Sequence, residues 1–202
     1  MLKKTLLVSG IALAVAAPAM AEQRTSMVRD NGFSYTYGQL AYDRWDLDNG
    51  WDVDAITAEG SFALDEHLFL RGSLGFYDGD LDRGPFPDAD VDGHRLSGGM
   101  GFHTPLQRGL DFVTTADIIY DEVDVDRGDD DEIGFELRGG VRHATTEQLE
   151  LSGGLTYMDL YDDDLGVYGQ GLFKLTPVVD LGARVVVGGD RDTYGVFGRY
   201  NF

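Results

Sequence analysis

Carboxylates are the most frequent side chains in this chain that could do chemistry, and some of them follow a known spacing. Asp88, Asp90 and Asp92 stand at alternate positions, and Gly93 follows them. This spacing is typical of the opening of a calcium-binding loop. The twelfth position of the pattern is Gly99 instead of the glutamate that completes such a loop. Two interpretations stay open: a site for Ca²⁺ or Mg²⁺, or a solvated anionic surface with no cofactor.

The histidines and serines do not form a catalytic arrangement. A nucleophile activated by histidine needs both groups on one side of the protein and within hydrogen-bonding reach. In the strand pattern described below, His67, His103 and His143 fall near one end of the fold. His94 falls at the other end, but it faces away from Ser97. The chain also lacks cysteine, which excludes a thiol nucleophile and a disulfide scaffold. We therefore expect no enzymatic activity.

Charged residues recur inside otherwise apolar segments, at one parity of a two-residue repeat. The basic members are Arg71, Arg95, Arg138, Arg142, Arg184 and Arg199, with Lys174 in addition, and the acidic members are Glu59, Asp111, Asp117, Glu136, Glu150 and Asp180. Buried charges are costly unless they are paired. The near balance of the two sets predicts a network of ion pairs on the inner face of a sheet.

Ten segments of alternating apolar residues would position these charges. They span residues 33–43, 52–64, 68–77, 94–103, 110–120, 133–143, 149–159, 166–175, 179–188 and 193–202. A period of two residues is typical of strands. In the first segment, Phe33, Tyr35 and Tyr37 fall on the opposite parity from Leu40 and Tyr42, which implies a bulge or an uncertain register.

The connections between these segments alternate between short turns and longer acidic stretches, chiefly 78–93, 121–132 and 160–165. An even number of such strands with this alternation is typical of bacterial outer-membrane barrels, and a sheet can cross a bilayer only when it closes on itself. We predict an all-β fold, a single closed antiparallel transmembrane barrel of ten strands with both termini in the periplasm. Eight strands are the alternative. A soluble periplasmic β-sandwich or lipocalin-like barrel is the competing fold.

The two ends of the chain predict where the protein goes. Residues 1–21 have the charged start, apolar stretch and small residues of a secretory signal, with cleavage near Ala21. Residues 22–32 would then be a periplasmic segment and residues 33–202 the outer-membrane barrel. Tyr200 and the terminal Phe202 resemble the C-terminal assembly signal of such barrels. We therefore expect export, cleavage and insertion by the barrel-assembly machinery.

Net charge and strand number restrict the partners and the lumen. The formal net charge is −20, which argues against a nucleic-acid partner because phosphate binding needs clustered basic residues. We expect the protein to be a monomer, and we expect its partners to be outer-membrane lipid and lipopolysaccharide. About eight strands leave an interior filled by side chains, whereas water-filled porins use 16–18. Inward glycines argue for space; they are Gly75, Gly99, Gly101, Gly140, Gly154 and Gly182. A filled lumen and a narrow passive channel both stay open.

Several stretches of the chain resemble the small xanthomonad-type outer-membrane barrels, the family once proposed as a secreted activator of plant immunity. These are FSYTY at 33–37, EGSFAL at 59–64 with the strand over 68–77, HRLSGGMGFH at 94–103, FELRGGVR at 135–142, and the closing 194–202. The resemblance implies an outer-membrane and vesicle-associated barrel linked to surface properties such as motility and biofilm. It carries over no catalytic site.

Overall fold

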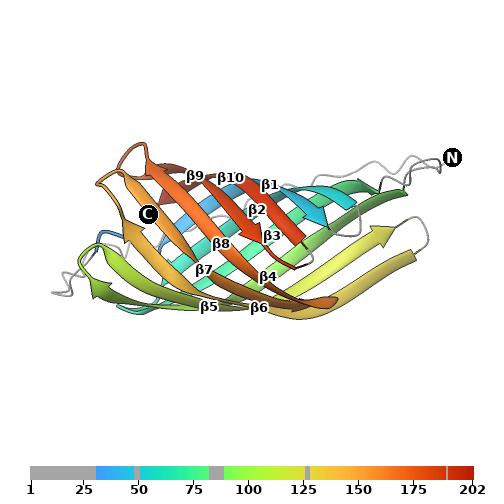
Figure 1. Ribbon diagram of the computed structural model, residues 1–202, viewed down its shortest axis with the longest axis horizontal. Coiled ribbons are helices and arrows are strands. Elements are labelled where there is room, and N and C mark those ends of the chain that lie inside the picture. Colours follow the sequence, from blue (N-terminus) through green and yellow to red (C-terminus); the bar gives the residue numbers. More distant parts are fainter. Residues whose placement is uncertain (1–30, 48–50, 82–88, 126–127, 190) are drawn as a thin grey trace.

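A computed structural model describes residues 31–47, 51–81, 89–125, 128–189 and 191–202. Its strands form one elongated barrel (Figure 1). In the described residues there are ten of them: β1 (Tyr37–Leu47), β2 (Trp51–Ala63), β3 (Leu68–Leu81), β4 (Ala89–Gln107), β5 (Leu110–Val125), β6 (Gly128–Ala144), β7 (Leu149–Leu160), β8 (Asp162–Lys174), β9 (Val179–Val187) and β10 (Arg191–Asn201). Across these ranges, no helix has the length and apolar character needed to cross a membrane.

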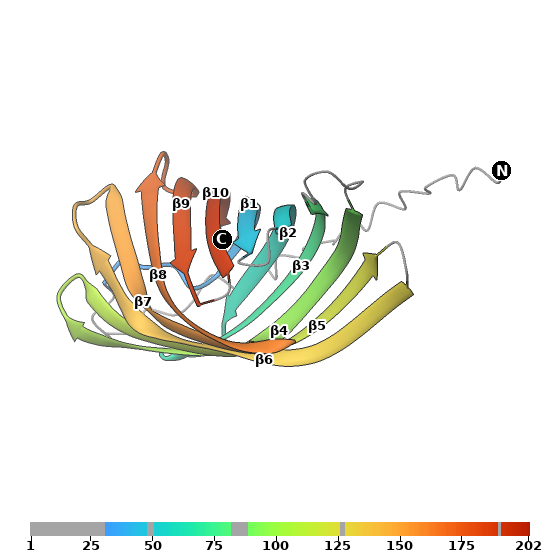
Figure 2. The ribbon, with the colours of Figure 1, turned by 45° about the vertical axis from the view of Figure 1, so that its right-hand side comes forward.

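The barrel is closed by pairing of the first strand with the last. Each strand pairs antiparallel with the next one along the chain, and β1 pairs with β10 from Tyr37 opposite Asn201 to Leu47 opposite Arg191. The strands run obliquely around the barrel (Figure 2). The prediction of a single closed antiparallel barrel with ten strands is confirmed, and the eight-strand alternative is wrong.

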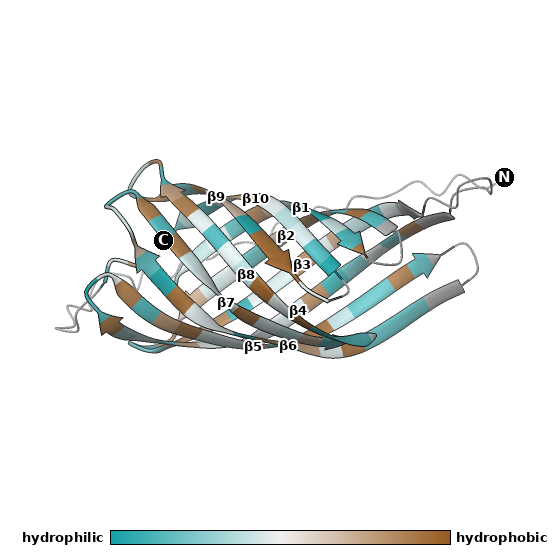
Figure 3. Cartoon of the chain, in the orientation of Figure 1, coloured by the Kyte–Doolittle hydropathy of each residue, from teal (hydrophilic) through white to brown (hydrophobic). Residues whose placement is uncertain are grey.

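The outer face of the barrel is the apolar one. Ile118 and Leu165 are each 67% exposed, whereas the carboxylates of Asp43 and Asp121 are almost fully buried inside. Apolar and polar residues alternate along the strands (Figure 3). A soluble barrel would hide its apolar parity inside, while a membrane barrel presents it to lipid. The soluble sandwich or lipocalin-like alternative is therefore wrong.

Short turns mark one end of the barrel, which we call the turn end. They join β2 to β3, β4 to β5, β6 to β7 and β8 to β9. The turn between β4 and β5 consists of Arg108 and Gly109, and Gly109 has a φ of 73°. A left-handed backbone at this position favours glycine because it has no Cβ to clash. Tyr37 and Asn201 pair at the same end, so the first and last strands begin and finish together there.

The opposite end carries long strand extensions rich in aspartate, and we call it the acidic end. The long connections predicted at 78–93, 121–132 and 160–165 are wrong, because β3 continues to Leu81, β5 continues to Val125, and Tyr161 alone separates β7 from β8. Aspartate disfavours strands in general. Here the backbone ladder continues from the membrane part in unbroken register, and the side chains reach water.

Tyrosines on the outer face mark the boundary of the apolar band toward the acidic end. Each donates a hydrogen bond to a nearby carboxylate: Tyr42 to Asp54 (2.9 Å), Tyr120 to Glu122 (3.1 Å), Tyr157 to Asp163 (3.1 Å) and Tyr194 to Asp192 (3.4 Å). Tyrosine suits this position because its ring is apolar and its hydroxyl is polar.

The start of the first strand differs from the prediction. β1 begins at Tyr37, so the predicted strand start at residue 33 is wrong. Gln39, Ala41 and Asp43 are buried inside, and Leu40 and Tyr42 are exposed outside. One parity therefore holds along the whole strand, and β1 needs no bulge. Residues 31–36 precede the strand and enter the barrel.

Candidate functional site: the lumen of the barrel

A connected set of ion pairs lies in the middle of the lumen. Arg71 on β3 lies 3.7 Å from Glu59 on β2 and 3.5 Å from Asp117 on β5. Arg184 on β9 donates a 2.7 Å hydrogen bond from Nε to Asp43 on β1, and its Nη1 lies 4.0 Å from Glu59. Because inward side chains alternate on every strand, these strands can place their charges at one level.

Further ion pairs lie at other positions along the lumen. Arg138 contacts Glu136 at 2.9 Å on the same strand. Glu150 accepts from Arg142 at 2.7 Å and from Lys174 at 2.8 Å. At the acidic end, Arg95 forms a two-point contact with Asp121, with both nitrogen to oxygen distances 3.0 Å. Such bidentate geometry is the strong form of an arginine–carboxylate pair.

Three of the predicted lumen residues form no arginine–carboxylate ion pair with another described residue. Arg199 donates from Nε and Nη2 to the amide oxygen of Gln39 and lies 3.9 Å above the ring of Tyr37. Asp180 accepts from Asn201 at 2.7 Å. Asp111 accepts from Tyr35 and Asn31, as described below.

Sequence reasoning missed several lumen residues, among them Asp43, Asp121 and Gln39. Asp121 falls in the predicted connection 121–132, which the structure shows to begin as strand. Asp43 stood at the end of a strand whose register was unsettled. The sequence signal for Asp43 and Asp121 is their parity: both occupy inward positions when the two-residue repeat is continued through the predicted strand ends. Gln39 carries no charge, so a count of charges could not find it.

Residues 31–36, the N-terminal segment, fill the lumen at the turn end. The side chains of Phe33 and Tyr35 are buried against Phe69. Asn31 donates to a carboxylate oxygen of Asp111 at 2.6 Å and accepts from the backbone N–H of Gly109 at 2.9 Å. These bonds hold the segment across the mouth of the barrel.

Tyr35 is the centre of this seal. Its hydroxyl donates to Asp111 at 2.9 Å, and its ring stacks on His103 with 3.7 Å between ring centroids. Its backbone oxygen accepts from Ser61 at 2.8 Å. Burial raises the pKa of the Tyr35 hydroxyl far above its ordinary value, with Arg142 opposing and Asp111 adding to the effect. The hydroxyl therefore stays protonated and remains a donor.

An apolar cluster lies inside the barrel toward the acidic end. Val53, Ala55, Tyr77 and Val91 are buried together, and Trp45 packs against them. The guanidinium of Arg95 lies 4.8 Å from the centre of the Trp45 ring, and that of Arg191 lies 5.2 Å from it. A second buried cluster lies beside this level and consists of Ile119, Met158 and Leu160. Closely packed aromatic and aliphatic groups reduce the space left for water.

The inward glycines do not leave open space. A Cβ on Gly101 would overlap the ring of Phe69, and one on Gly182 would overlap the ring of Phe197. A Cβ on Gly140 would meet the hydroxyl of Tyr168 at 2.5 Å. Gly101 and Gly182 make room for a ring on the neighbouring strand, an arrangement known to stabilise sheets, and Gly140 makes room for the hydroxyl of Tyr168 two strands away. The interpretation that such glycines leave space for a channel is wrong at these positions.

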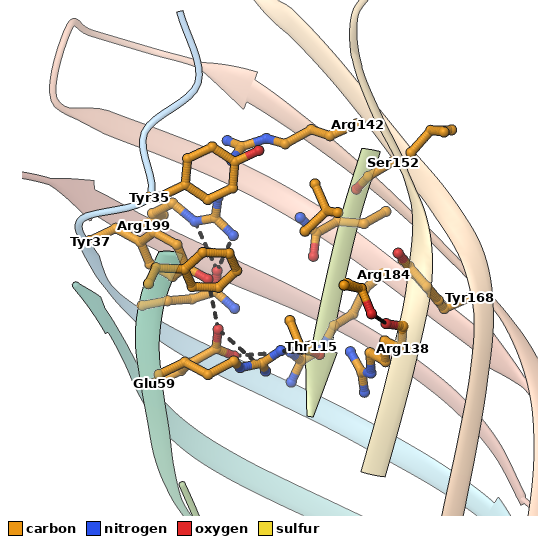
Figure 4. Close-up of a pocket in the computed structure, with 17 residues that line it drawn as sticks. Tyr35, Tyr37, Glu59, Thr115, Arg138, Arg142, Ser152, Tyr168, Arg184 and Arg199 are labelled. Carbon is orange, nitrogen blue, oxygen red and sulfur yellow. Dashed lines mark hydrogen bonds and ion pairs between the residues drawn. The ribbon is translucent and has the colours of Figure 1, made fainter. Parts of the chain in front are cut away.

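A chamber of about 110 Å³ lies in the lumen next to Tyr35 of the N-terminal segment. Among the described residues that line it, five are arginines and one is an acid: Arg71, Arg138, Arg142, Arg184, Arg199 and Glu59. Tyr35, Tyr37, Thr115, Ser152 and Tyr168 add hydroxyl groups (Figure 4). The volume corresponds to a few water molecules.

The calcium-loop interpretation does not fit the acidic end. Asp88 lies outside the described residues. Asp90, Asp92 and Gly93 belong to β4, where an extended backbone cannot curl around a cation. In the described ranges, no group of three or more acidic or histidine side chains could hold a metal ion.

Aspartates on neighbouring strands do stand directly opposite one another at this end. Asp54 pairs in register with Asp78, Asp78 with Asp92, and Asp92 with Asp124. They share the parity of the exposed Ile56, Phe76 and Ile118, so they lie on the outer face. Like charges directly opposite one another destabilise a sheet.

Known structures share the fold of this chain. The NanC porin aligns over 82% of this chain and all of its own length, with 8% identity and a TM-score of 0.51. The translocator domain of the autotransporter NalP from Neisseria meningitidis covers 83% of this chain and 87% of its own, with 11% identity and a TM-score of 0.52. The β domain of the Bordetella autotransporter BrkA covers 84% and 99%, with 13% identity and a TM-score of 0.50. No curated protein matches the chain in sequence.

The model of one protein family matches most of the sequence. It describes the outer membrane protein beta-barrel domain and matches residues 6–176. The closed antiparallel sheet and its apolar outer face agree with that description. The chain therefore belongs to the outer membrane protein beta-barrel domain family, and its location is the bacterial outer membrane.

Proposed function

We propose that this protein is a structural and surface-interaction barrel whose lumen is closed, so that its acidic end is the working surface. The observation that carries this proposal is the packing of side chains inside the barrel at two levels, and we propose that this packing closes the lumen at both. Residues 31–36 fill the turn end, and the cluster around Val53 and Tyr77 fills the other end. The ion pairs between them are then structural. We propose no enzymatic role, because among the described lumen residues no serine or threonine hydroxyl is hydrogen-bonded to a histidine that could activate it.

Single-channel conductance of the refolded chain in a planar bilayer tests this proposal. Folding is first shown by heat-modifiable mobility on a gel. We expect no current steps across salts and voltages. Reproducible steps from the folded wild-type barrel would refute the closed lumen.

Variants that open one or both of these closures are the controls for an absence of current steps. Phe33→Ala/Tyr35→Ala loosens the turn end, and Trp45→Ala/Tyr77→Ala loosens the acidic end. Each pair alone should stay silent because the other closure remains. The fourfold variant should conduct, which shows that the assay detects an open lumen of this size.

The acidic end fits a role at the cell surface. Rows of in-register aspartates there need counterions, and divalent cations can bridge carboxylates to the phosphates of lipopolysaccharide. This partner is part of the proposal, together with a monomeric state and the surface properties implied by the resemblance to xanthomonad-type barrels. Calorimetric titration of the refolded barrel with Ca²⁺ and Mg²⁺ tests it, and absence of uptake of both ions would contradict it.

The second candidate is a narrow passive channel, and the arginine-lined chamber favours it. In a channel, those arginines would set ion selectivity. Arg138→Ala and Arg142→Ala should then shift the reversal potential in a salt gradient. In a closed barrel the same changes lower stability and leave no conductance to alter.

A further inference from the structure

The chamber in the middle of the lumen has more positive than negative groups on its wall. Five arginines line it, and Glu59 is the acid that lines it among the described residues. Glu59 contacts Arg71 and Arg184. The other carboxylates that pair with the lining arginines stand outside the lining; they are Asp43, Asp117, Glu136 and Glu150. Four of the five guanidinium groups therefore hold a carboxylate and also line the chamber, and Arg199 lines it without one.

Hydrogen-bond donors in this wall outnumber acceptors. A guanidinium has five N–H donors and no acceptor. In the described part of the chain, Arg199 has no carboxylate ion partner, and two of its nitrogens share the single amide oxygen of Gln39. The Nε of Arg138 is buried and lacks a hydrogen-bond partner among the described residues. A buried donor without a partner is costly, and more so when it is charged.

The size of the chamber restricts what could supply the missing acceptors. Its volume of about 110 Å³ is the space of a few water molecules. A tetrahedral oxyanion, with its oxygens around one central atom, is of comparable size, whereas a sugar acid or a peptide is larger. The labelled arginines come from several strands around the chamber (Figure 4), and arginine is the side chain best suited to oxyanions because its donors form a planar fork.

We propose that this chamber binds one small oxyanion from solution, of the size of phosphate or sulfate. The anion would accept hydrogen bonds from arginines such as Arg138 and Arg199 and from hydroxyl groups such as that of Tyr168. The side chains of Arg71, Arg142 and Arg199 are largely buried, and a charged hydrogen bond is stronger in a low-dielectric setting than in water. Lipid phosphates do not reach this site, because it lies inside the barrel wall.

Equilibrium dialysis of the refolded chain in nonionic detergent against radiolabelled phosphate tests the site, with empty micelles as the blank. We expect saturable uptake that approaches one phosphate per barrel and is displaced by unlabelled sulfate. Absence of saturable uptake above the micelle blank would overturn the proposal and leave water as the content of the chamber. This readout does not depend on whether the barrel conducts.

Two chamber variants and one control locate the binding. Arg199→Gln should weaken phosphate binding by roughly tenfold or more, since it removes a charged donor. Arg44→Gln should not change it, because Arg44 lies on the outer face in an exposed pair with Asp52. Gln170→Glu places a carboxylate in the wall; it should pair with the arginines, keep the barrel folded and abolish phosphate uptake. Wild-type uptake by a folded Gln170→Glu barrel would overturn the proposal, even if the Arg199 variant fails to fold.

Discussion

Removal of the Asp43 carboxylate is the sharpest test of a dry lumen. The carboxylate is 2% exposed and accepts from two nitrogens of Arg184, one of them at 2.7 Å. Asp43→Ala leaves the Arg184 guanidinium with Glu59 4.0 Å away as its remaining carboxylate neighbour in the described residues. Breaking a buried pair by removing one partner costs about 3–5 kcal/mol, because the other charge stays buried. The free energy of unfolding changes by about 1–3 kcal/mol per M urea, so the urea midpoint should fall by about 1 M or more.

A matched control is the ion pair made by the next residue along the strand. Arg44 faces outward and pairs with Asp52 at 2.9 Å, with both side chains more than half exposed. Exposed pairs contribute little because water screens them. Asp52→Ala should therefore shift the midpoint far less than Asp43→Ala. The assay is urea unfolding in lipid vesicles, followed by gel mobility and circular dichroism.

The double variant separates charge from packing. Asp43→Ala/Arg184→Ala removes the stranded charge, so it should be less destabilised than the sum of the single changes. Equal midpoint shifts for Asp43→Ala and Asp52→Ala would mean that water screens the inner pair as well as the outer one. That result would refute the closed, dry lumen on which the proposed function depends.

Three further predictions follow from other parts of the barrel. Tyr35→Phe should cost about 1–3 kcal/mol of unfolding free energy, because the buried Asp111 loses a hydrogen bond; urea titration checks this, and an unchanged midpoint would contradict the role of the N-terminal segment. Gly101→Ala should destabilise the barrel because the new methyl group overlaps the Phe69 ring, whereas Gly98→Ala on the same strand meets open space and should not; equal thermal midpoints of the two variants would count against the glycine–ring packing. Tyr200→Ala/Phe202→Ala should lower the folded fraction in bacterial outer membranes while refolding in detergent stays efficient, and equal loss in both settings would show that these residues act in stability and not in assembly.

Much of the fold was predictable from local pattern. A residue's side of a strand follows from its parity, and the apolar parity of strands such as β3 and β9 predicted the membrane-facing side. The number of strands followed from the repeat length and the turns. Strand ends at the acidic end were not predictable in this way, because aspartate composition indicates loops while the ladder of hydrogen bonds continues through Asp78 and Asp92.

By itself, the sequence determined which residues face the lumen, since a period of two residues requires only a continuous strand. It did not determine which charges meet. Arg184 pairs with Asp43, which is 141 residues away in sequence, because closure of the sheet brings β1 next to β10 and close to β9. The sealing of the lumen by Phe33 and Tyr35, and the placing of rings over Gly101 and Gly182, likewise depend on the stagger between strands. That stagger is a property of the closed barrel and not of any one strand, which is why the tertiary structure alone decided it.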